Sequence, residues 1–195
     1  MAALAHEGTF EPPRFYAGRM LLALPAMGDT NFERAAIAMC VHDENGAMGI
    51  DVGNIIPGLS LGELMANFGI EATDLSHVPV LRGGPVDPQR GFVLHSTDWG
   101  GQDYVEITAE WGLSGSLDVL KAIAAGTGPS RYLLALGYSG WGPGQLEHEM
   151  TMNGWFLGEE IPETLAALVP SRRWDACYAA CGVDARLLSG SAGEA

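Results

Sequence analysis

Three short apolar segments follow one another near the start of the chain without a helical pattern between them, and this arrangement constrains the fold more than any other feature. The segments are Met20–Ala23, Ala35–Val41 and Met48–Val52. Asn45 and Gly46 lie between the second and the third, and Asn-Gly is the strongest short signal for a β-hairpin because its turn positions favour a positive φ. Parallel strands need a long crossover, usually a helix, between them. We therefore predict an antiparallel arrangement for this part of the chain.

The rest of the chain alternates between apolar runs and glycine-rich breaks. Further strands are predicted at 79–82, 92–95, 104–108 and 132–138, and helices at 61–68, 117–125, 144–153, 162–168 and 172–181. Ser116 and Gly126 flank the second helix as its N-cap and C-cap residues, and Pro143 is expected just inside the third. The pattern predicts an α+β fold with a curved, mainly antiparallel sheet. We expect an N-terminal arm at 1–17, one domain at 18–188 and a disordered tail at 189–195.

The charge of the chain limits the classes of partner. Lys and Arg number 10 against 24 Asp and Glu, which gives a formal net charge of −14, and Lys121 is the sole lysine. Nucleic-acid binding depends on Lys and Arg neutralising phosphates, so no direct nucleic acid is expected as a partner. Arg172 and Arg173, followed by Asp175, would make a poor recognition helix.

The apolar runs and the cysteines indicate the compartment. The longest apolar runs, such as Met20–Met27, fall far short of the roughly 18 residues that span a bilayer, so no membrane association is expected. The first 20 residues lack a basic segment followed by an apolar one. Cys40, Cys177 and Cys181 form an odd set, which argues against a secreted disulfide scaffold. We expect a cytoplasmic protein in which Cys40 is buried and unpaired.

The most concentrated glycine feature covers residues 137–149, where a strand runs through a glycine loop into a helix. The free N–H groups of a helix N-terminus make an anion site conceivable, but the loop lacks the ending of a phosphate-binding loop and Glu147 would repel a phosphate. A ligand here is expected to be neutral or cationic, and the alternative is a purely structural loop. The candidate ligand-binding residues in this segment are Gly140, Trp141, Gly142, Gln145 and Glu149.

A second glycine feature precedes the strand predicted at 92–95. Gly83, Gly84 and Pro85 permit a backbone conformation that is closed to other residues and a close approach to a ligand or a strand. His95 is the best titratable candidate, because an unperturbed imidazole changes its charge near neutral pH. If the protein binds a ligand, we expect both loops and His95 to line one cleft. The alternative is that the two loops simply pack on each other.

Catalytic and metal-binding motifs are incomplete. Ser139 lies in a strand–loop–helix context, but Trp141 takes the place of the second glycine of a nucleophile elbow. His148-Glu149 begins like a zinc-protease helix, yet Met152 stands where the second His is needed. The two C-terminal cysteines have no second pair to complete a structural zinc site. We assign no catalytic residue, metal or cofactor.

Five motifs taken together resemble the AlgH/YqgE family of bacterial proteins. They are residues 22–32, residues 42–49, Gly83-Gly84-Pro85-Val86, residues 91–95, and residues 137–149 with Asn153 and Trp155. The resemblance covers roughly residues 18–170. It implies an α+β fold in which a small closed β-barrel is surrounded by helices. Members of the family are often called transcriptional regulators, but the family has no DNA-binding motif and no established enzymatic activity.

The chain departs from this family where members usually read Asn-Arg-Pro after the hairpin, because Gly53, Asn54 and Ile55 stand there instead. The usual residue at Ser139 is alanine in the family, which weakens the nucleophile reading further. The resemblance favours a non-enzymatic regulatory protein that acts through an unknown protein partner or small molecule. The alternative is a small-molecule-binding protein or enzyme that uses the glycine loops at 83–86 and 137–145.

Overall fold

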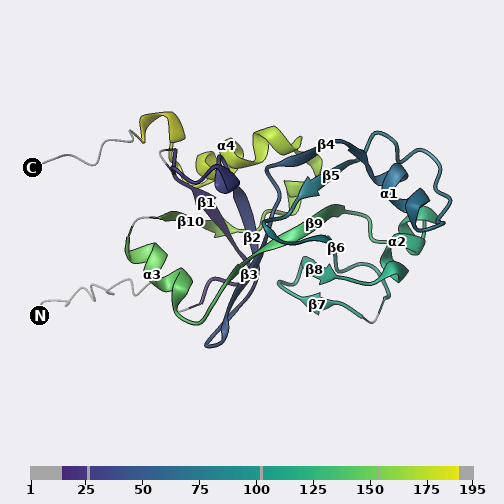
Figure 1. The fold of residues 1–195 in the computed structure, drawn as a ribbon, viewed down its shortest axis with the longest axis horizontal. Coiled ribbons are helices and arrows are strands. Elements are labelled where there is room, and N and C mark those ends of the chain that lie inside the picture. Colours follow the sequence, from purple (N-terminus) through teal and green to yellow (C-terminus); the bar gives the residue numbers. More distant parts are fainter. Residues whose placement is uncertain (1–14, 26, 102, 153, 189–195) are drawn as a thin grey trace, which may run out of the picture.

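Strand β9 (Tyr132–Trp141) runs through the middle of the sheet and has neighbours on both sides along its length (Figure 1). The structure, a computed structural model, describes residues 15–25, 27–101, 103–152 and 154–188. The bounds of the other strands are β1 Arg19–Ala23, β2 Ala36–Asp43, β3 Gly46–Asp51, β4 Ile55–Ser60, β5 Pro79–Arg82, β6 Val86–Ser96, β7 Val105–Glu106, β8 Trp111–Ser114 and β10 Trp155–Glu160. The helices are α1 Leu61–Asn67, α2 Leu117–Ala124, α3 Gln145–Thr151 and α4 Pro170–Ala180, with short 3-10 helices at Thr30–Phe32, Glu163–Ala167 and Ala185–Leu187.

The sheet is mainly antiparallel, as predicted, and its strand order is β10-β1-β2-β3-β9-β6-β8-β7. The β5–β9 pair is parallel, and β4 pairs with β5. The predicted hairpin joins β2 to β3, with Asp43 paired to Gly46, and Gly46 has a φ of 136°. The α+β class and the curved antiparallel sheet are therefore confirmed.

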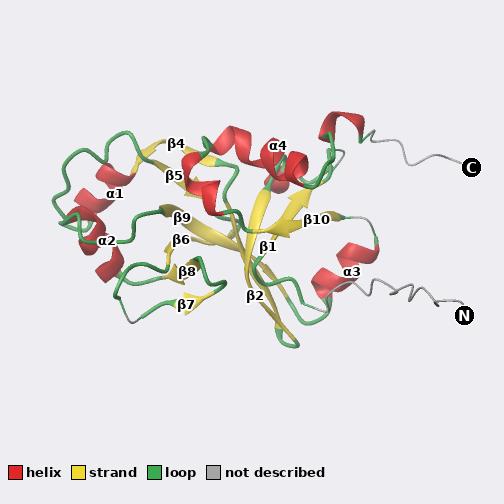
Figure 2. Cartoon of the chain, turned by 180° about the vertical axis from the view of Figure 1, so that it is seen from behind, coloured by secondary structure: helices red, strands yellow, loops and turns green. Residues whose placement is uncertain are grey.

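The closed barrel implied by the family resemblance is wrong for this chain, because the sheet is an open half-barrel. Strands β10 and β7 stand at the two ends of the strand order and do not pair with each other. Helix α4 takes part in the core cluster on the inner face of the curl, where Trp174 and Tyr178 pack with residues such as Leu22 and Ala38 (Figure 2).

The outer face of the sheet is covered at two places. Helix α3 places Leu146 in a cluster with Trp141 and Trp155 over β1, β2 and β3. Helices α1 and α2 cover the opposite end, where their leucines pack with residues of β6 and β9. Burial of each apolar side chain contributes roughly 1.5–3 kcal/mol, so these clusters hold the helices against the sheet.

Several local predictions need correction. Strands β4, β8 and β10 were not anticipated, and the helix predicted at 162–168 is a 3-10 helix at Glu163–Ala167. Helix α3 begins at Gln145 with Gly144 at the N-cap position, so Pro143 lies before the helix and not inside it. Ser116 does occupy the N-cap position of α2, but its side chain makes no capping hydrogen bond. The arm predicted at 1–17 lies mostly outside the described residues, as does the tail at 189–195.

The cysteines are free thiols. Cys40 and Cys177 are buried, and burial raises the pKa of the Cys40 thiol to about 12, so this thiol is inert at neutral pH. Among the described residues, no helix is long and apolar enough to cross a membrane. No group of three or more His, Cys, Asp or Glu side chains in the same part of the chain is placed to hold a metal ion.

Candidate functional site

The two predicted glycine loops contact each other directly. Strand β5 pairs with one side of β9 and β6 pairs with the other, so the chain between them must pass across β9. It passes at Gly83–Pro85, where a Cβ on Gly84 would lie 2.1 Å from the carbonyl carbon of Tyr138 and one on Gly83 would lie 2.3 Å from the oxygen of Gly137. These glycines are needed because two backbones touch at the crossing.

Trp141, Gln145 and Glu149, predicted as site residues, form a hydrogen-bonded cluster at the end of β9. Glu149 accepts hydrogen bonds from the indole N–H of Trp141 (2.9 Å), from the indole N–H of Trp155 (2.8 Å) and from the amide of Gln145 (2.9 Å). The backbone N–H of Gly142 donates to Oε1 of Gln145 at 3.0 Å. Both indoles are buried, so the carboxylate satisfies two donors that have lost their water. The cluster fixes the loop that joins β9 to α3.

A groove lies beside this cluster, across strands β2, β3, β9 and β6. We call it the sheet groove, and it has a volume of about 570 Å³. The residues that line it include Val41, Asp43, Met48, Arg90, Phe92, Tyr138, Gly140 and Trp141. The Phe92 and Tyr138 rings meet edge to face at 5.7 Å, and the Arg90 guanidinium lies 5.1 Å from the centre of the Phe92 ring. Gly140 and Trp141 are the predicted site residues that line it.

His95 lies elsewhere and does not line the sheet groove. It is fully buried, with Nδ1 at 2.9 Å from the carbonyl oxygen of Ser96 and Nε2 at 2.9 Å from Oγ of Ser114. Burial lowers its pKa, so the ring is neutral at neutral pH, when Nδ1–H donates to the carbonyl and Nε2 accepts from the hydroxyl. Trp99 and Tyr104 stack edge-on against it. The imidazole thus has a complete set of partners at the β6–β8 pair, apart from the groove that Gly140 and Trp141 line.

A contact between buried His42 and half-exposed Glu147 was not found from the sequence. The backbone N–H of Tyr16 donates to Nδ1 of His42, which leaves Nε2–H to face Glu147 at 3.2 Å. The contact of Glu147 with a histidine 105 residues earlier in the chain depends on the tertiary fold, and no local pattern indicates it. This pair joins the β2–β3 hairpin to α3, next to the Trp141–Glu149 cluster.

Asp51, two residues before the segment that differs from the family pattern, is also buried. Asp51 accepts hydrogen bonds from the N–H groups of Ala36 and Gly53 and from the amide of Asn54. Burial raises its pKa to about 6, although these hydrogen bonds oppose the rise. Gly53 and Asn54 line a small polar pocket with Arg82 and Trp174. Two of the altered residues, Gly53 and Asn54, therefore hydrogen-bond a buried carboxylate in the connection between β3 and β4.

The fold is an α+β half-barrel in which the sheet curls around α4 and a glycine loop crosses β9. The AlgH-like family pattern (DUF179) matches residues 20–186, and the chain belongs to that family. A UPF0301 protein of Sphingopyxis alaskensis is 50% identical over 183 residues, which are 94% of this chain and 98% of that protein. A UPF0301 protein of Novosphingobium aromaticivorans is also 50% identical, over 93% of this chain and 97% of its own length.

The solved structures agree with this assignment. The solution structure of the AlgH protein from Pseudomonas aeruginosa matches with a TM-score of 0.75 and 39% identity, covering 96% of this chain and 100% of that one. A crystal structure of a protein from Corynebacterium diphtheriae matches with a TM-score of 0.67 at 19% identity, over 86% of this chain and 87% of that one, which shows a shared fold. Family and fold are thereby settled, and the activity has to be argued from the surfaces of the molecule.

Proposed function

We propose that this protein is a non-enzymatic regulator that acts in the cytoplasm through a protein partner, and that the sheet groove binds a neutral or basic segment of that partner. The groove is the observation that carries the proposal. Its lining includes the apolar and aromatic side chains of Met48, Phe92 and Tyr138, and apolar grooves of this kind accept the anchoring side chains of partner proteins. Its backbone is fixed by the hydrogen bonds of four paired strands, so it needs little ordering on binding.

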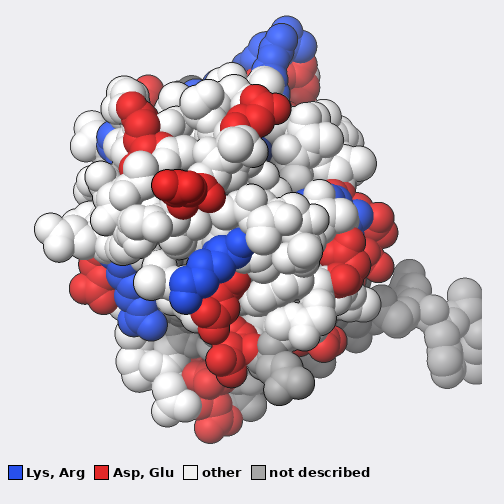
Figure 3. All heavy atoms as spheres, turned by 90° about the vertical axis from the view of Figure 1, so that its right-hand side faces the viewer, with Lys and Arg blue, Asp and Glu red and all other residues white. Residues whose placement is uncertain are grey.

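The charge of the molecule favours a neutral or basic partner. The net charge is −14, Asp43 lies at the side of the groove, and the positive charge of Arg90 rests over the Phe92 ring. On the face at the α1–α2 end, acidic side chains are scattered and each basic side chain lies beside acidic ones (Figure 3). A field of this sign accelerates the approach of a basic segment and slows that of an acidic one.

The proposal is tested with two matched valines. Val41 lines the groove and is 36% exposed, whereas Val105 in β7 is 53% exposed and does not line the groove. We expect a phage-displayed library of random 12-residue peptides, selected on the unaltered protein, to yield sequences with aromatic or aliphatic residues beside Lys or Arg. The selected peptides should bind at least tenfold more weakly to Val41→Arg, because the arginine side chain occupies the groove and its charge repels basic peptides. They should bind equally well to Val105→Arg. Fluorescence anisotropy with labelled peptides measures this.

Equal binding of the selected peptides to both variants would place the interaction outside the groove and overturn the proposal. A selection that yields acidic peptides would contradict its charge argument. Thermal melts of both variants provide the control for folding, because each valine is already exposed on a strand.

Direct binding to duplex DNA is expected to be absent. A protein of charge −14 approaches a polyanion against its own field, and salt screens this repulsion without reversing it. In a gel-shift titration at about 0.15 M salt, we expect no sequence-specific complex with the isolated protein. Sub-micromolar binding that survives competitor DNA would refute this prediction and favour a direct transcriptional role.

A further inference from the structure

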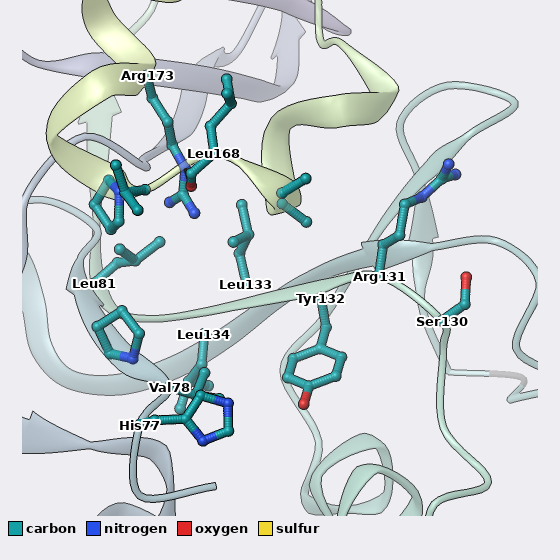
Figure 4. A pocket seen from close by; sticks show the side chains of 15 residues that line it. His77, Val78, Leu81, Ser130, Arg131, Tyr132, Leu133, Leu134, Leu168 and Arg173 are labelled. Atoms are coloured by element: carbon teal, nitrogen blue, oxygen red, sulfur yellow. Dashed lines mark hydrogen bonds between the residues drawn. The ribbon is translucent and has the colours of Figure 1, made fainter.

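A second pocket lies between strands β5 and β9 and the start of α4, and none of the ligand-binding residues predicted from the sequence lines it (Figure 4). Its volume is about 450 Å³, within the range typical of small-molecule sites. Its walls are mostly apolar and include Val78, Leu81, Leu133, Leu134 and Leu168. A pocket of this size and lining accepts an apolar body.

One buried cation faces this pocket. Arg173, on α4, is only 3% exposed and lines the pocket, and Figure 4 shows its guanidinium directed between Leu81 and Leu168. Its Nε–H donates to the carbonyl oxygens of Leu165 and Leu168 at 3.1 Å, and Nη1 donates to that of Val52 at 2.8 Å. Nη2 makes no hydrogen bond within the described residues, so the guanidinium retains donors for a further acceptor.

The charge of Arg173 has no carboxylate bonded to it in the part of the chain that the structure describes. Arg131, the other arginine of the pocket, forms ion pairs with Glu110 and Glu163 and points away from the centre. Burial lowers the pKa of Arg173 to about 10, and Cys177 and then Asp51 oppose this shift, so the side chain is charged at neutral pH. The carboxylate oxygens of Asp51 accept hydrogen bonds from donors other than Arg173. A buried charge is costly unless an opposite charge compensates it.

We propose that this pocket binds a small apolar monocarboxylate, a medium-chain fatty acid being the simplest example, with its carboxylate on Arg173 and its chain against the leucines. Arginine suits this role because its planar fork matches the two oxygens of a carboxylate. Arg173 is the buried cation of the pocket, and the lining near it is apolar, whereas the other polar lining residues are His77, Ser130, Arg131 and Tyr132. One buried positive charge beside apolar walls fits a single negative charge on an apolar body. The site is independent of the sheet groove.

The acidic surface of the protein does not exclude such a ligand. At physiological ionic strength the Debye length is about 8 Å, so exposed charges farther away than this are largely screened. Inside the pocket, the Arg173 guanidinium is a full positive charge that is not bonded to a carboxylate. The low-dielectric walls strengthen its attraction for a bound carboxylate. The repulsive outer field affects the rate of approach more than the final affinity.

The experiment titrates the protein with decanoate, 1-decanol and acetate by isothermal calorimetry. Decanoate is expected to bind in a saturable 1:1 manner. Decanol, which lacks the charge, and acetate, which lacks the body, should each bind at least tenfold more weakly. The Nε–Hε signal of Arg173 in an NMR titration should shift with decanoate and not with decanol.

Variants distinguish this pocket from other sites. Ala167 is exposed at the pocket and Ala180 is exposed at the end of α4, outside it. Ala167→Trp should weaken decanoate binding at least tenfold by filling the mouth, and Ala180→Trp and the groove variant Val41→Arg should change it less than twofold. Arg173→Met should abolish binding if circular dichroism shows a folded protein, and if it does not fold, Ala167→Trp and the ligand series decide. Decanol binding as tightly as decanoate, unchanged binding by Ala167→Trp, or no saturable decanoate binding would each overturn the proposal.

Discussion

Replacing Gly84 by alanine is expected to lower the free energy of unfolding by more than about 4 kcal/mol, or to prevent folding altogether. A Cβ at this position would lie 2.1 Å from the carbonyl carbon and 2.3 Å from the carbonyl oxygen of Tyr138, and 2.3 Å from the nitrogen of Ser139. These atoms belong to the backbone of β9, which is held by pairs on both sides and cannot move aside. The φ of Gly84 is also positive, at 153°, a conformation that alanine adopts only with strain.

Gly91, in the strand β6 that follows the crossing, provides the control. A Cβ there would meet only a Leu136 methyl group at 3.8 Å, which is an ordinary contact, and the backbone needs no positive φ. Gly91→Ala should therefore change stability by less than about 1 kcal/mol. Urea unfolding followed by tryptophan fluorescence measures both variants. If Gly84→Ala unfolds at the same urea concentration as the unaltered protein, the backbone at Gly84 does not approach β9 as closely as described above.

Elements with a strong local signal could be predicted from the sequence. The hairpin at Asn45-Gly46 and the strand at 132–138 each combine an apolar run with a clear break. Strand β4 contains Pro57 and Gly58, both poor strand residues, and pairs with β5 at an irregular register, so only its neighbour explains it. Strand β8 has only 4 residues, and Gly112 in β8 and Gly158 in β10 interrupt the apolar patterns of these strands. The open form of the sheet could not be predicted either, because it depends on where α4 packs and no local sequence pattern indicates this.

The candidate site was predictable in its residues more than in its arrangement. Sequence reasoning singled out Trp141 and Glu149, which the structure joins by a hydrogen bond, but it could not separate them from His95 at another part of the sheet. Ligand binding by these residues stays a prediction. Arg173 was weighed only as part of a poor DNA-recognition helix, because adjacent arginines suggest an exposed basic surface. Its burial follows from three carbonyl groups, one of them 121 residues away in the chain, and no local pattern signals such a contact.

Glu149→Ala is expected to lower the free energy of unfolding by about 2–4 kcal/mol, since it leaves two buried indole donors without an acceptor. The carboxylate of Glu149 serves Trp141 and Trp155 together, and no other hydrogen bond of either indole N–H is present among the described residues. Gln145→Ala removes an exposed member of the same cluster and should lower stability by less than about 1 kcal/mol, since water replaces its contacts.

A double-mutant cycle with Trp141→Phe tests whether the cost of Glu149→Ala comes from the unpaired indole. Phenylalanine keeps an aromatic ring in the cluster but has no N–H to satisfy, so Glu149→Ala should be less harmful in this background. We expect the two substitutions to be non-additive by about 1–2 kcal/mol, within the range for residues that share a hydrogen bond. Urea unfolding of the four proteins gives the coupling. Additivity within about 0.5 kcal/mol would mean that the indole finds another acceptor and that Glu149 does not anchor the loop between β9 and α3.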